Sequence, residues 1–101
     1  MDEPRPTFAV LYRWRLRPGM EEDFKHAWAL QTDAIKRERG GLGSRLHRTP
    51  DGWWAAYALW PDRETWARSP GPPRQDAAAT MLACILERRE PLELTILDDR
   101  L

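Results

Sequence analysis

The stretch SRLHRTPDGWWAAYALW, residues 44–60, decides the fold, because it has the pattern of two strands joined by a tight turn. An Asp-Gly pair at 51–52, preceded by Pro50, is a typical hairpin turn sequence. The turn separates a predicted strand at 44–49 from another at 53–60. An antiparallel hairpin is therefore expected in the middle of the chain, and the flanking elements must pack against it.

A strand and a long helix are predicted before the hairpin. Residues 7–17 alternate with a period of two, so that Tyr12 and its apolar neighbours face one side and arginines face the other. Pro18 and Gly19 end this strand, and a helix follows from about 20 to 39, with acidic residues in its first turn and basic residues in its last. One face of this helix carries Phe24, Ala27, Trp28, Gln31, Ala34 and Ile35.

Two further helices and a last strand are predicted after the hairpin. A short helix at 61–66 has Asp62 as its cap, and a segment rich in proline and glycine stops it. A longer helix is expected at 74–89, where Pro91 prevents its continuation, and 92–97 form a strand. The order predicts an α+β, ferredoxin-like βαββαβ sandwich with a four-stranded antiparallel sheet and helices on one face.

Length and composition predict one globular domain over 1–101, with its core at about 7–100. Sixteen basic residues balance sixteen acidic ones, so binding to nucleic acid is not expected. No apolar run has the length of a membrane span or signal peptide, which predicts a cytoplasmic protein with no membrane partner. One cysteine, Cys84, and two histidines without ligand spacing predict no metal site.

The third predicted strand is apolar on both faces, although helices cover only one face of such a sheet. One face carries Trp54, Ala56, Ala58 and Trp60, and the other carries Trp53, Ala55, Tyr57 and Leu59. A homodimer through the open face is the simplest way to bury the second set. Arg13 and Arg15 are expected either to meet Glu93, in the same chain or its partner, or to face water at the rim.

Three short motifs resemble the antibiotic biosynthesis monooxygenase family. They are YALWPDRE at 57–64, Arg-Pro-Gly at 17–19 and Gly-Leu-Gly at 41–43, and the resemblance covers residues 7–100. It implies a dimeric α/β barrel in which two sheets pack by their open faces, with a ligand cavity between each sheet and its own helices. It also implies varied functions, among them the oxygenation of polyketide phenols to quinones without a cofactor, and haem degradation.

The resemblance can be carried over residue by residue. Quinone-forming members have an asparagine and two aromatics where this chain has Ala56, Trp60 and Trp66, so the aromatics are present and the amide is missing. Haem degraders use an asparagine on the first strand and a histidine on the last helix. Tyr12 and a helix without histidine occupy those places, so haem degradation is not expected.

Tyr12 and His47 are the predicted catalytic residues. Tyr12 would donate a proton or a hydrogen bond to an oxyanion, the alternative being a bond to backbone or to Gln31. His47 would be the base, the alternative being a surface or interface histidine. Trp60 and Trp66 would stack against a planar ligand, the alternative being core packing. The predicted ligand-binding set is Trp14, Trp28, Gln31, Ala56, Trp60 and Trp66.

These expectations predict a dimeric monooxygenase that needs no metal, flavin or haem and acts on a planar phenolic or polyketide-like molecule. A second interpretation, favoured by the alanine at position 56, is a non-catalytic module that binds a small ligand or only dimerises. A third is an isomerase or cyclase on the same barrel, which needs one proton-shuttling group and no oxygen.

Overall fold

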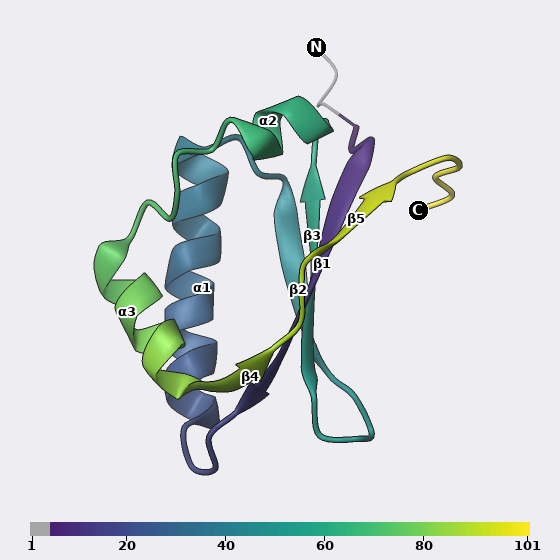
Figure 1. The fold of residues 1–101 in the computed structure, drawn as a ribbon. Helices are drawn as coiled ribbons and strands as arrows, with labels where there is room; N and C mark the ends of the chain where they lie inside the picture. Colours follow the sequence, from purple (N-terminus) through teal and green to yellow (C-terminus); the bar gives the residue numbers. More distant parts are fainter. Residues whose placement is uncertain (1–4) are drawn as a thin grey trace.

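The computed structural model describes residues 5–101 as one antiparallel sheet with its helices on one side (Figure 1). The sheet order is β2-β3-β1-β4, and β5 also pairs with β1. The predicted ferredoxin-like α+β class is thus confirmed, with five strands in place of four. The elements are β1 (Phe8–Leu16), α1 (Glu21–Glu38), β2 (Gly43–Arg48), β3 (Trp54–Trp60), α2 (Arg63–Ala67), α3 (Gln75–Cys84), β4 (Ile85–Arg88) and β5 (Leu92–Thr95).

The central hairpin forms as its turn sequence predicts. The Thr49 amide donates to the Trp53 carbonyl at 2.8 Å, and the Gly52 amide donates to the Thr49 carbonyl at 3.1 Å. Gly52 has a φ of 85°, a left-handed conformation that side chains disfavour. Across the strands Ser44 pairs with Ala58 and His47 with Ala55, which assigns every β2 side chain to a face.

The C-terminal third differs from the prediction. The helix expected to reach residue 89 ends at Cys84, and β4 begins at Ile85. The apolar spacing of 78–85 fits a helix, but β1 is nine residues long and its free edge needs hydrogen-bond partners. β4 pairs with one end of β1 and β5 with the other, so Pro91 lies between two strands and does not end a helix.

The core beneath α1 consists of two clusters of buried residues. Phe24 is fully buried in the first, with its ring 5.1 Å from that of Trp14 and 6.1 Å from that of Trp54, both edge-on. Phe8, Val10 and Trp60 form the second. Tyr12, on β1, packs against both clusters, which places it at the gap between them.

The open face of the sheet has an apolar half and an arginine-rich half. Leu11, Tyr57, Leu59, Leu92 and Leu94 form the open-face patch, because Leu11 pairs with both Tyr57 and Leu92, and Ala9 pairs with both Leu59 and Leu94. Leu92 is 55% exposed. In the other half, the guanidinium groups of Arg89 and Arg15 lie 4.7 Å and 5.9 Å from the ring centre of Trp53.

The ion pairs of the sheet differ from those expected. Arg15 bonds to Glu87 of β4 at 3.0 Å, whereas Glu93 bonds to Arg63 of α2 at 2.6 Å. The register explains this, because Glu93 pairs with Val10 and therefore faces the helices, away from Arg13 and Arg15.

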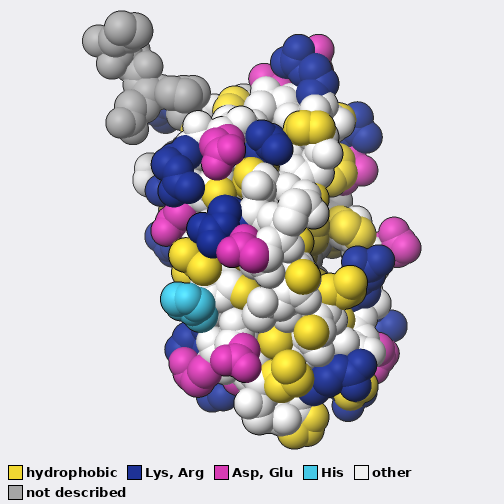
Figure 2. Space-filling view, turned by 90° about the vertical axis from the view of Figure 1, so that its left-hand side faces the viewer, with side chains coloured by type: hydrophobic (Ala, Val, Ile, Leu, Met, Phe, Trp, Pro, Cys, Tyr) yellow, Lys and Arg dark blue, Asp and Glu magenta, His cyan; other side chains and the backbone are white. Residues whose placement is uncertain are grey.

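The helix side carries charges of both signs in mixture, without a large patch of one sign (Figure 2). No helix within residues 5–101 is long and apolar enough to cross a bilayer.

Replacing Phe24 with alanine should lower the free energy of unfolding by about 3 to 5 kcal/mol, because it leaves a cavity between two buried indoles. Urea unfolding followed by circular dichroism measures this. Leu82→Ala is the control, since Leu82 is 67% exposed, and it should change stability by less than about 0.5 kcal/mol. Similar losses in the two variants would contradict this description of the core.

Candidate ligand pocket

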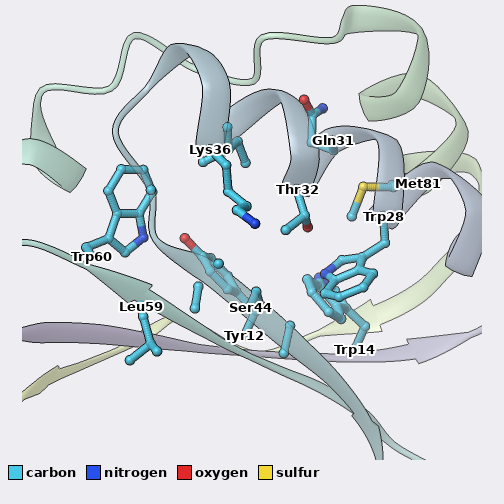
Figure 3. A pocket seen from close by; sticks show the side chains of 15 residues that line it. Tyr12, Trp14, Trp28, Gln31, Thr32, Lys36, Ser44, Leu59, Trp60 and Met81 are labelled. Carbon is cyan, nitrogen blue, oxygen red and sulfur yellow. The ribbon is translucent and has the colours of Figure 1, made fainter. Parts of the chain in front are cut away.

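A cavity of about 180 Å³ lies between α1 and the sheet, in the gap between the two core clusters (Figure 3). Trp14 and Trp28 stand at one end and Trp60 at the other. Ala56 and Ala58 of β3 line it from the sheet, and Met81 of α3 reaches it from the helix side. The lining is predominantly apolar, as is usual for small-molecule sites.

The room for this cavity comes from residue size along β3. Ala56 and Ala58 face the helices between Trp54 and Trp60, which are 9% and 5% exposed. The indoles at the strand ends pack under α1, and the methyl groups between them fill little of the space. Gly41 also lines the cavity, and a Cβ there would lie 2.7 Å from Cγ2 of Ile35, so any larger residue would displace Ile35.

Tyr12 places a phenol at the edge of this cavity. Nε1 of Trp66 donates a hydrogen bond to its hydroxyl oxygen at 3.0 Å, and no residue within 5–101 accepts the phenolic proton. Burial raises the pKa of Tyr12 above its ordinary value of 10.0, and the bond from Trp66 offsets this only in part. The phenol is therefore protonated at neutral pH and can donate a hydrogen bond to a ligand.

Trp66 borders a second, more open hollow of about 510 Å³ and not the cavity itself. The two spaces share Tyr12, Ile35 and Trp60, so they adjoin at the Tyr12 ring. Trp66 also packs at a tilt on Phe8, with ring centres 5.6 Å apart. Trp60 and Trp66 line this second hollow together, so the prediction that both indoles stack on one ligand applies to the hollow and stays a prediction. In the smaller cavity Trp60 alone is a wall, and Trp66 positions the phenol through its hydrogen bond.

Gln31 lines the cavity but uses its amide to hold two helices together. Its Nε2 donates to the Arg74 carbonyl and its Oε1 accepts from the Arg74 amide, both at 2.9 Å. Arg74 precedes α3, so this pair of bonds ties α3 to α1. The proposed bond between Tyr12 and Gln31 does not occur.

His47 lies on the opposite face of the sheet from Tyr12. It pairs with Ala55, which in turn pairs with Arg13, so all three belong to the open face. Its Nδ1 is 3.2 Å from the Ala55 carbonyl oxygen. The prediction that His47 shares a pocket with Tyr12 is therefore wrong, because the pleat sends odd-numbered residues of β2 away from the helices.

Sequence reasoning did not assign nine of the lining residues to the site: Thr32, Ile35, Lys36, Gly41, Gly43, Ser44, Ala58, Leu59 and Met81. Thr32 and Lys36 follow Trp28 at intervals of four, so the three share a helix stripe beside the buried one. This spacing is the signal that the sequence offers for them. Ser44 Oγ is buried without a hydrogen-bond partner among the described residues.

The cavity has hydrogen-bond donors but no residue suited to accept a proton from a ligand. No aspartate, glutamate or histidine lines it. Within residues 5–101, no three histidine, cysteine or acidic side chains are grouped in a way that could hold a metal ion. The arrangement can therefore orient a flat ring and stabilise negative charge on it.

Solved structures with this fold include enzymes. SnoaB, a cofactor-independent oxygenase from Streptomyces nogalater, superposes with a TM-score of 0.76 at 17% identity over 95% of this chain and 98% of its own. A protein from Chloroflexus aurantiacus whose name places it with the antibiotic biosynthesis monooxygenases superposes with a TM-score of 0.75. The two sequences are 18% identical over 92% of this chain and 95% of the other. Rv0793 from Mycobacterium tuberculosis superposes with a TM-score of 0.73 at 18% identity, over 92% of this chain and 97% of its own.

No protein-family model and no curated protein matches the sequence. At these identities, the structural likeness confirms that the chain has the fold of the antibiotic biosynthesis monooxygenases. The activity has to be argued from the pocket.

Trp66→Phe should raise the pKa of Tyr12 further, because the lost hydrogen bond favours the phenolate. The measurement is an NMR titration of ¹³C-labelled tyrosine in a Tyr57→Phe background, which leaves Tyr12 as the only tyrosine. Trp28→Phe is the control, since Trp28 makes no hydrogen bond to Tyr12. An unchanged or lowered pKa in Trp66→Phe would show that the bond does not form in solution.

Proposed function

We propose that the protein is a cofactor-independent monooxygenase acting on a planar phenolic or polyketide-like small molecule. The observation that carries this proposal is the Tyr12 phenol, which is held by Trp66 at an apolar cavity and keeps its proton for a ligand. The fold shared with SnoaB, a cofactor-independent oxygenase, supports it.

In the proposed reaction the ring lies between the Trp28 and Trp60 ends of the cavity, and its oxygen accepts a hydrogen bond from Tyr12. This bond stabilises the negative charge that develops on the substrate oxygen when the substrate's own hydroxyl group loses its proton to water. The electron-rich ring carbon then bonds to dioxygen. One oxygen atom remains as the new quinone oxygen and the other leaves as water, so the substrate itself supplies the electrons.

Oxygen uptake with a panel of phenols and anthrones tests the proposal. Tyr12→Phe should lower turnover by about 10²-fold, the scale of losing one oxyanion donor. His47→Ala is the matched control and should retain turnover, because His47 lies on the other face of the sheet. Loss of turnover in His47→Ala with full activity in Tyr12→Phe would reverse the assignment.

Two alternatives to the oxygenase differ from it: one carries out no reaction, and the other carries out a reaction that does not use oxygen. A non-catalytic binding or dimerisation module is favoured by the absence of a carboxylate or imidazole from the cavity lining and by Ala56 within that lining. An isomerase or cyclase would use Tyr12 as its proton donor. Binding without turnover would favour the first, and turnover without oxygen uptake would favour the second.

We also propose that the protein is a homodimer through its open face. The open-face patch, Leu11, Tyr57, Leu59, Leu92 and Leu94, is a contiguous apolar surface on a sheet with no helix over it (Figure 1). A two-fold axis would bury the patch of each copy against the other. A small aromatic ligand would be the second partner.

A cytoplasmic location is part of the proposal. Cys84 is the chain's single cysteine, and it is buried and free. A domain that gains no stability from disulfides suits a reducing compartment.

Leu92→Asp should dissociate the dimer, because it places a charge in the patch. Sedimentation equilibrium measures the mass. Leu82→Asp makes the same change at a residue of α3 that is 67% exposed, and it should remain dimeric. A monomeric wild-type protein, or dissociation by Leu82→Asp alone, would reject this interface.

A further inference from the structure

Lys36 places a positive charge at the mouth of the cavity. Its side chain leaves the α1 stripe of Trp28 and Thr32 and carries its ammonium group down toward the sheet (Figure 3). The chain has two lysines, and the other, Lys25, bonds to Glu22 at 3.5 Å. No carboxylate within residues 5–101 lies within 4.0 Å of the Lys36 ammonium. The charge is therefore not neutralised by a neighbouring acid.

Two further polar groups of the cavity lack partners. Ser44 Oγ is buried without a hydrogen bond, and the Tyr12 proton has no acceptor among residues 5–101. Ser44 pairs with Ala58 on the helix-facing side of the sheet, and both residues line the cavity. Lys36 and Tyr12 therefore present unmatched donors, and Ser44 has a hydroxyl able to donate.

A neutral apolar ligand would cover these groups without satisfying them, and buried polar groups without partners cost free energy. A ligand with a negatively charged oxygen supplies both the charge and the acceptors that the lining lacks. An ammonium group near an apolar, partly closed space attracts an anion more strongly than it would in open water.

We propose that Lys36 makes the cavity selective for aromatic molecules that carry an oxyanion, either a carboxylate or an ionised phenol. The inference takes two points from the proposed function: that the cavity is the ligand site and that the ligand is aromatic. It does not require a reaction with oxygen. It also gives the proposed reaction an origin for the phenolate, since the cavity contains no base. Lys36 would stabilise the ionised form, and water would take the proton.

The cavity volume of about 180 Å³ sets the size of the test ligands. A cavity of about 150 Å³ accommodates benzene, so a single substituted ring fits here, and larger ring systems would extend into the hollow beneath Trp66. Three probes share one ring and differ in charge: 4-nitrobenzoate is an anion, 4-nitrophenol can ionise, and its methyl ether 4-nitroanisole cannot.

Isothermal titration calorimetry with these probes tests the inference. Wild-type protein should bind 4-nitrobenzoate or 4-nitrophenol more tightly than 4-nitroanisole. Lys36→Met keeps an unbranched side chain one atom shorter and removes its charge, and it should weaken binding of the preferred oxyanion about tenfold, a value reduced for the exposure of the ammonium. Binding of 4-nitroanisole should change less than about twofold, since the charge is the main loss.

Two control variants separate charge from shape. Lys36→Arg keeps the charge and should keep the oxyanion preference, and Lys25→Met removes a lysine outside the cavity and should have no effect. The visible absorbance of 4-nitrophenolate at fixed pH shows whether the phenol is bound ionised. A rise on binding that is lost in Lys36→Met supports the phenolate, and a preference for 4-nitrobenzoate without such a rise supports the carboxylate.

Three results would overturn the inference: equal weakening of all probes in Lys36→Met, a wild-type preference for 4-nitroanisole, or no binding of any probe. The oxygenase proposal fails separately. Oxyanion preference without oxygen uptake would reject the oxygenase and leave the role of Lys36 intact. Oxygen uptake that is unchanged in Lys36→Met, with no oxyanion preference, would reject only the role of Lys36.

Discussion

The alternation of side chains along β3 is the constraint on which the rest of the structure depends. Because the pleat has a period of two, Trp54, Ala56, Ala58 and Trp60 all face the helices. The indoles hold α1 away from the strand at both ends, and the alanines leave space between them. The cavity therefore results from the order of large and small residues in one strand. The same alternation makes the other face of β3 apolar, and no helix covers that face in the single chain.

At the edge of that space, the hydrogen bond from Trp66 to Tyr12 determines which part of the phenol stays free. The phenol of Tyr12 is half-buried, and Trp66 donates to its oxygen only, leaving its proton without an acceptor among residues 5–101. The proton is left for whatever occupies the cavity. Together with Lys36 and Ser44, it makes a lining that can stabilise negative charge but contains no carboxylate or imidazole to remove a proton. Under the proposed function such a pocket would act on a ligand by electrostatics, and ionisation of the ligand would depend on how well the lining stabilises its anion.

Much of the fold could be predicted, because its signals are local. The Asp-Gly turn gives the hairpin, the charge pattern gives α1, and Asp62 accepts from the Thr65 amide at 2.7 Å as the predicted cap of α2. The boundary between α3 and β4 at Cys84 could not be predicted. Residues 85–88 were expected to continue the helix, and they form a strand because the free edge of β1 lies beside them. That edge belongs to a strand about 70 positions earlier in the chain.

By itself the sequence determined the class of fold, the two-faced sheet, and most of the aromatic lining, since each of these follows from residue type and spacing. Only the tertiary structure decided that His47 faces away from Tyr12, that Trp66 holds the phenol, and that Lys36 reaches the cavity. The physical reason is that a shift of one residue in a strand turns its side chain to the other face. Contacts between a strand and a helix also depend on how far apart the two elements pack, and the local sequence pattern does not determine that separation.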